Sequence, residues 1–268
     1  MSWVKVAIAG AVALGAAMFG RPVPVAKPGP HNTGPSAPAL LVPSGSIFAD
    51  EDGMVIENVD VTGVIVVEAD NVTIRNFRVN AMGASYGVAA SWNSGTVIED
   101  GEIINAGSAG LIGKQLEARR LHIHHCEKDG MKIHNDSLVE GCWVELVGMA
   151  AGAHADGNQT RSGRNIIFRG NNIDMPVGIP GHASNAAFMI QDEVGPIENF
   201  VIDGNWLNGG NHTIFLAHEQ FGGPQNIVIT NNRFGRDFLY STFFPDSLDY
   251  TAVNNRWDDT GELLPWNN

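Results

Sequence analysis

Apolar and polar positions alternate along most of the chain, and the alternation recurs in short segments rather than in one long run. Each segment has an apolar residue, a polar residue, a corner rich in Asn, Asp or Gly, and then a second apolar alternation. Nine segments align in this way, at spacings of roughly 18 to 34 residues: VIENVDV from Val55, TIRNFRV from Thr73, VIEDGEI from Val97, EARRLHI from Glu117, LVEGCWV from Leu138, IFRGNNI from Ile167, VIDGNWL from Val201, VITNNRF from Val228 and TAVNNRW from Thr251. Short repeats with period-two alternation predict the coils of a β-solenoid, because one coil cannot bury its own apolar face.

A second strand in each coil shows the same alternation. Six segments align: GVAAS from Gly87, GLIGK from Gly110, GMKIH from Gly130, GNQTR from Gly157, AFMIQ from Ala187 and TIFLA from Thr213. Their second and fourth positions are mostly apolar and are expected to point inwards, so the third and fifth should point outwards. The outward positions of the later coils are Lys114, Lys132, His134, Gln159, Arg161, Met189, Gln191 and Phe215.

Four short motifs carry a resemblance to a known group of proteins. They are HNTGP at 31–35, VPSG at 42–45, NVTIRNFRV at 71–79 and HADGNQ at 154–159. Over about residues 45 to 260 the chain resembles the pectate-lyase-like superfamily, and these motifs resemble actinobacterial secreted proteins and minor tail proteins of their phages. The resemblance implies an all-β, right-handed parallel β-helix. It departs at Asn158, where the group favours a hydrophobic residue.

The first 43 residues differ in character from the repeats. Residues 4–19 are apolar and rich in Ala and Gly, and two interpretations stay open for residues 1–20: a secretory signal or a retained hydrophobic helix. Residues 21–43 are dense in proline, which predicts an extended tether. The β-helix domain is then expected to occupy residues 44–268.

Composition narrows the function classes. The net charge of −13 argues against a nucleic-acid partner, for which a basic face is expected. The two cysteines, Cys126 and Cys142, are read as small buried apolar residues, with a disulfide as the alternative. No CxxC, HExxH or DxD spacing indicates a metal site, so neither a metal nor a cofactor is expected.

The stretch HADGNQTRSGR at 154–164 and the neighbouring coil hold the candidate chemistry. A carboxylate beside a Lys or His suits acid–base catalysis, which makes His154, Asp156 and Lys132 the catalytic candidates. The candidates for substrate binding are Gln159, Arg161, His134, Lys114, Gln191, Met189 and Phe215. The alternative is structural: Asp129-Gly130 and Asp156-Gly157 are one turn repeated in adjacent coils.

Three functions follow from these features and the resemblance. The leading hypothesis is an extracellular β-helix protein that engages cell-surface polysaccharide as a phage tail component. It would contact other tail proteins through residues 1–43 and form a homotrimer, as β-helix tail proteins often do. The second is a secreted polysaccharide lyase or glycoside hydrolase. The third is a purely structural solenoid without a ligand.

Overall fold

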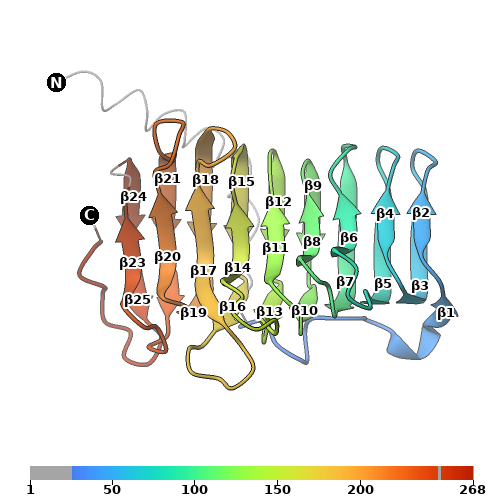
Figure 1. The fold of residues 1–268 in the computed structure, drawn as a ribbon, viewed down its shortest axis with the longest axis horizontal. Helices are drawn as coiled ribbons and strands as arrows, with labels where there is room; N and C mark the ends of the chain where they lie inside the picture. The colour runs from blue at the N-terminus through green and yellow to red at the C-terminus, as the bar shows by residue number, and fades with distance from the viewer. Residues whose placement is uncertain (1–25, 247–248, 268) are drawn as a thin grey trace.

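The computed structural model describes residues 26–246 and 249–267, and this part of the chain winds into one elongated solenoid (Figure 1). Two parallel sheets run along its length. The first contains β1 (Val42–Ser44), β3 (Val55–Thr62), β5 (Thr73–Asn80), β7 (Thr96–Ile104), β9 (Leu116–Arg119), β10 (His122–His124), β12 (Ser137–Glu140), β13 (Trp143–Glu145), β15 (Gly163–Arg169), β16 (Asn172–Met175), β18 (Ile197–Asp203), β19 (Trp206–Gly209), β21 (Gln225–Thr230), β22 (Arg233–Phe234), β24 (Tyr250–Val253) and β25 (Arg256–Trp257).

The second sheet takes one strand from each coil. Its strands, in spatial and chain order, are β2 (Ile47–Ala49), β4 (Ile65–Val67), β6 (Tyr86–Ala90), β8 (Ala109–Gly113), β11 (Asp129–Ile133), β14 (Ala155–Thr160), β17 (Ser184–Gln191), β20 (His212–Ala217) and β23 (Ser241–Pro245). Neighbouring strands of this sheet come from successive coils, so their order in the sheet is their order along the chain. The described residues contain one short 3-10 helix, η1 (Pro38–Leu40).

The register of both sheets matches the alignment of the repeats. The first residues of the nine segments pair in order, from Val55 with Thr73 to Val228 with Thr251. The second positions of the other set pair in order from Val88 to Ile214. The predicted right-handed parallel β-helix is therefore confirmed for the described residues.

Polar corners let the chain turn between strands. The first sheet bends at Asn58 and Asn76, whose φ angles of 59° and 45° lie in the left-handed region that Asn tolerates well. In later coils the residue after the corner is an asparagine buried to 0% exposure, and these residues form a ladder: Asn171, Asn205, Asn232 and Asn255. Each side-chain amide in this ladder donates to the side-chain oxygen of the next, at 2.9 to 3.0 Å. The ladder satisfies polar groups that the coils bury.

The core runs between the sheets as one continuous apolar column. Phe168 packs edge-on against Phe188 and stacks with Phe200, with ring centroids 4.9 and 5.7 Å apart. Cys126 and Cys142 are buried free thiols, which confirms their interpretation as small apolar residues.

The proline-rich segment lies against the solenoid. Residues 26–41, called the strap below, run along the first sheet toward β1 (Figure 1). The Gly34 amide donates to the Arg120 carbonyl at 3.0 Å, and the Asn172 side chain donates to the Pro28 carbonyl at 3.0 Å. The sequence predicts an extended tether for residues 21–43, and the described part of it is bound along its length. Proline blocks helix formation but leaves its carbonyl free to accept, so an extended strap can bond to side chains beneath it.

The predicted segment 1–20 lies outside the described residues. Within residues 26–246 and 249–267, no helix has the length and apolar character needed to cross a membrane.

Candidate functional site

The predicted polar face centres on two adjacent strands of the second sheet, β11 and β14. Met131 pairs with Asn158, which places Lys132 directly beside Gln159 on the outer face. The Lys132 ammonium donates to the Gln159 side-chain oxygen at 2.7 Å. The predicted alignment of GMKIH with GNQTR is therefore confirmed.

Lys132 is the centre of a hydrogen-bonded cluster from three coils, called the lysine cluster: Asp129, Lys132, Asp156, Gln159 and Asn185. Its ammonium lies 2.5 Å from the Asp129 carboxylate, and that carboxylate also accepts the Asp156 backbone amide at 2.9 Å. Gln159 and Asn185 donate to the two oxygens of Asp156, at 3.4 and 2.9 Å. The Lys132 ammonium thus pairs with Asp129 and is linked to Asp156 through Gln159.

Burial controls the charge of this cluster. Asp156 is 1% exposed, and its desolvation, together with the nearby Asp129 carboxylate, raises its pKa well above the ordinary value. Lys132 and the two donors oppose this shift without cancelling it. The geometry thus places a buried carboxyl group with a raised pKa next to a second carboxyl group that Lys132 contacts.

The turn predicted at each Asp-Gly pair is wrong. Both aspartates lie in strands, and neither Gly130 nor Gly157 has a positive φ. A Cβ on Gly130 would lie 2.6 Å from the Gly157 carbonyl oxygen, and one on Gly157 would lie 2.8 Å from the Ala187 carbonyl oxygen. The glycines are needed because successive coils approach closely, and a turn conformation is not their reason.

The second outward column of the same face carries Lys114, His134, Arg161 and Gln191. The His134 ring nitrogen Nδ1 lies 3.0 Å from the Ser162 carbonyl oxygen, and burial lowers the pKa of His134. Arg161 and Gln191 both donate to the Glu193 carboxylate, at 2.6 and 2.9 Å. Lys114 is half-buried, and the described residues provide no ion pair for it.

A shallow pocket of about 300 Å³ lies just after His134 and Arg161 in the chain. It is lined by Asn135, Ser162, Gly163, Arg164, Pro196 and Glu198. Arg164, the last residue of the stretch that the sequence analysis singled out, is exposed there. The pocket extends the polar face around the corner into the first sheet.

The column that begins with Lys132 and Gln159 becomes apolar in the later coils. Met189, Phe215 and Phe244 pair in order on β17, β20 and β23. The rings of Phe215 and Phe244 stack with centroids 4.9 Å apart and an interplanar angle of 6°, and Phe244 is 40% exposed. Together with His212 and the exposed Tyr240, they form an aromatic platform.

The catalytic candidate His154 does not join the cluster, whereas Asn158 points inwards as its position in the alignment predicted. His154 is exposed, and within the described part of the chain no hydrogen bond or ion pair joins it to the lysine cluster. Asn158 points into the core with 0% exposure. Its side-chain oxygen accepts the Ile133 amide at 3.2 Å and its side-chain amide donates to Thr160 at 3.0 Å, so a polar residue is accommodated where the resembling group favours an apolar one.

A group on the first sheet was not predicted from the sequence: Glu102, His122 and His124. The nine-segment alignment places Glu102 and His122 at the same position of neighbouring coils, and His124 follows at the next outward position. The motif HIH on alternating outward positions was the available signal. No metal was expected from sequence spacing, because these residues meet only once the coils stack.

Comparison with known proteins does not assign the chain to a family. No family model matches the chain, and no curated protein matches it. One solved structure that resembles it is titled "Crystal structure of pectate lyase Pel9A", with a TM-score of 0.49 and 16% sequence identity over 90% of this chain and 72% of that chain. At this level of similarity the activity of that protein carries no argument for this one.

Proposed function

We propose that the protein binds a polysaccharide along the outer face of the second sheet. The observation that carries the proposal is the column Lys132, Gln159, Met189, Phe215 and Phe244, which continues over five successive strands. Neighbouring strands lie about 4.8 Å apart, close to the length of one sugar unit in an extended glycan. Each coil therefore offers one side chain to each successive sugar.

The two ends of this column suit different parts of a sugar. Carbohydrate rings have apolar faces that pack on aromatic side chains, and Phe215 with Phe244 offers a flat, partly exposed surface. At the other end, Lys132 and Gln159 offer polar groups to hydroxyl or carboxylate substituents. On the neighbouring column Lys114 adds positive charge, and Arg161 is paired with Glu193. Local cations of this kind would let an acidic protein bind an anionic glycan.

A lyase or glycoside hydrolase is the second candidate, favoured by the raised pKa of Asp156 beside the Asp129 carboxylate. An acid and a base on adjacent groups are what such reactions need. Access argues against it: Asp156 is 1% exposed, and no hydrogen bond or ion pair in the described part of the chain joins the catalytic candidate His154 to the cluster. Binding is therefore the better-supported function, and a purely structural solenoid is the remaining alternative.

A glycan array probed with the full chain, followed by analysis of released oligosaccharides, tests this proposal. Phe244→Ala and Lys132→Ala are expected to weaken retention of the bound glycan at least tenfold, without released products from the wild type. Val253→Ala and Arg75→Ala are matched controls, because these exposed residues lie on the first sheet. Turnover that His154→Ala abolishes would favour the enzyme, and no glycan retention at all would leave the structural alternative.

We further propose that the protein binds this glycan outside the cell, as a tail component of a phage particle. In it, residues 1–43 contact other tail proteins and the chains assemble as a homotrimer. The strap supports a route for this attachment, because Lys27 lies 3.8 Å from Asp258 near the last coil. Light scattering of the full chain measures the trimer. A mature N-terminus near residue 21, found by mass spectrometry, would contradict attachment through residues 1–20.

A further inference from the structure

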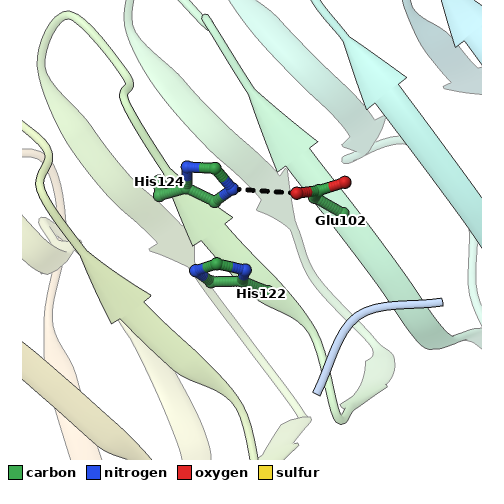
Figure 2. A group of neighbouring side chains, drawn as sticks. All are labelled: Glu102, His122 and His124. Carbon is green, nitrogen blue, oxygen red and sulfur yellow. Dashed lines mark hydrogen bonds and ion pairs between the residues drawn. The ribbon is translucent and has the colours of Figure 1, made fainter. Parts of the chain in front are cut away.

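A histidine-rich group on the first sheet is separate from the proposed glycan face. Glu102 lies in β7, and His122 and His124 lie in β10, the neighbouring strand. One carboxylate oxygen of Glu102 and one ring nitrogen of each histidine all lie within 4.8 Å of one another. Figure 2 shows the two rings side by side, with the Glu102 carboxylate facing His124.

Neighbouring groups hold these side chains in place. His124 Nε2 lies 3.1 Å from a Glu102 oxygen, and His122 Nε2 lies 3.1 Å from a Glu145 oxygen in the next coil. The His122 ring stacks with both His124 and Trp143, with centroids 4.0 and 4.1 Å away. These contacts restrict ring rotation, so much of the ordering that a ligand requires is already present.

The charges around the group favour a cation. Three carboxylates, those of Asp60, Glu102 and Glu145, lie on or beside the group. The Arg78 guanidinium pairs with Asp60 and Glu102, and Glu145 contacts His122 instead. The Arg78 bond uses one Glu102 oxygen, and the other oxygen faces His124. A divalent cation would balance the excess negative charge of this surface.

We propose that Glu102, His122 and His124 bind a divalent transition metal of the zinc class. Two imidazoles and one carboxylate are a donor set that suits zinc and its neighbours better than calcium or magnesium. Bonds of about 2.0 to 2.2 Å bring tetrahedral ligand atoms to about 3.4 Å from one another, so the side chains need to close by only about 1 Å. Glu145 lies beside His122 as the carboxylate partner that commonly accompanies a ligating histidine.

The bound metal would cross-link neighbouring coils. Its ligands come from two adjacent coils, and Glu145 belongs to a third. The strap also passes this point: Gly34 is buried, and a Cβ built on it would lie 3.9 Å from that of His122. Metal binding is therefore expected to stabilise the stacked coils and to hold the strap beside them.

Titration of the full chain with Zn²⁺ in a calorimeter, after chelator treatment and dialysis, tests the site. One equivalent is expected to bind and to raise the melting temperature, whereas Ca²⁺ should do neither. His124→Ala and Glu102→Gln should each weaken Zn²⁺ binding at least tenfold, and His218→Ala, which removes an exposed histidine outside the group, should leave it unchanged.

Cobalt substitution separates ligation from an indirect effect on folding. Co²⁺ bound by the wild type should give the visible absorption bands of a low-coordinate site, and these should weaken in His122→Ala while the circular dichroism of the β-helix is retained. The proposal is overturned if the folded wild type takes up no Zn²⁺, or if His122→Ala and His124→Ala together leave the affinity unchanged.

Discussion

The ammonium of Lys132 joins two coils, lying 2.5 Å from the Asp129 carboxylate and 2.7 Å from the Gln159 side-chain oxygen of the next strand. It is the one cation in the lysine cluster, where Asp129 and Asp156 are both buried. Its position explains how two carboxyl groups are tolerated in adjacent coils: one is neutralised by the lysine, and the other has a raised pKa. The stability of this region therefore depends on a single positive charge.

Replacing Lys132 tests that dependence. Lys132→Met keeps much of the aliphatic stem but leaves Asp129 buried without its cation, and should lower the free energy of unfolding by about 2 to 4 kcal/mol. Urea denaturation at neutral pH measures the change. The matched control is Arg75→Met, which removes an exposed ion pair with Glu57 and should change stability by about 1 kcal/mol or less. Equal losses in the two variants would contradict the proposed role of Lys132.

The buried asparagine ladder should also carry measurable stability. In Asn205→Ala, the Phe168 carbonyl loses its donor, and the Asn171 amide groups lose the oxygen that accepts them. Leaving these buried groups unpaired is expected to lower the free energy of unfolding by about 3 kcal/mol. Asn211→Ala, which removes one bond from a half-buried amide, should have an effect of about 1 kcal/mol. A smaller effect at Asn205 than at Asn211 would show that the ladder does not stabilise the coils.

Stability should fall in acid through Glu102. Hydrogen bonds from His124 and Arg78 outweigh desolvation and lower the pKa of Glu102 from 4.5 to about 2. The folded state therefore holds this carboxylate ionised where the unfolded chain takes up a proton. The contribution of the Glu102 carboxylate to the free energy of unfolding is complete above pH 4.5 and is lost as the pH falls toward 2.

The Glu102 contribution can be isolated by comparing two acid titrations. Solvent around this partly exposed carboxylate limits the effect to about 2 kcal/mol. Unfolding of the wild type should therefore lose about that much more stability over this pH range than unfolding of Glu102→Gln. Parallel pH curves for the two proteins would contradict the role assigned to Glu102.

Both thiols should be inert in the folded protein. Burial raises the pKa of Cys126 and of Cys142 to about 12, and both side chains are inaccessible. A thiol reagent at neutral pH should therefore label neither residue in native protein and both residues in urea, without a reductant. Rapid native labelling would contradict the burial, and failure to label the unfolded chain would indicate a disulfide.

The architecture could be predicted because its pattern is local. Each coil repeats the same alternation, and stacking identical positions leaves little choice of register, so Val55 and Val88 begin columns that the structure reproduces. The outward placement of Lys132 and Gln159 followed from the same alternation.

The features that the sequence did not reveal depend on contacts between distant segments. Asp129 and Asp156 each accept a hydrogen bond from the next coil, and Gly130 and Gly157 are set by close packing between coils, whereas in a single strand each Asp-Gly pair resembles a turn. Glu102 meets the two histidines only across a coil boundary, and the strap is held by contacts such as that between Gly34 and Arg120, 86 residues further along the chain. The spacing of residues along the chain does not predict such contacts between distant segments.

The course of the strap also determines how the molecule would carry a mechanical load. Lys27 lies beside Asp258, so a pull on the chain ahead of Lys27 reaches the contact near the last coil first. The bonds at Asn172, Arg120 and Asn76 would then break one after another, as in peeling, while the coils beneath stay stacked. A tension applied at this end would thus be dissipated in stages before it reached the first coil.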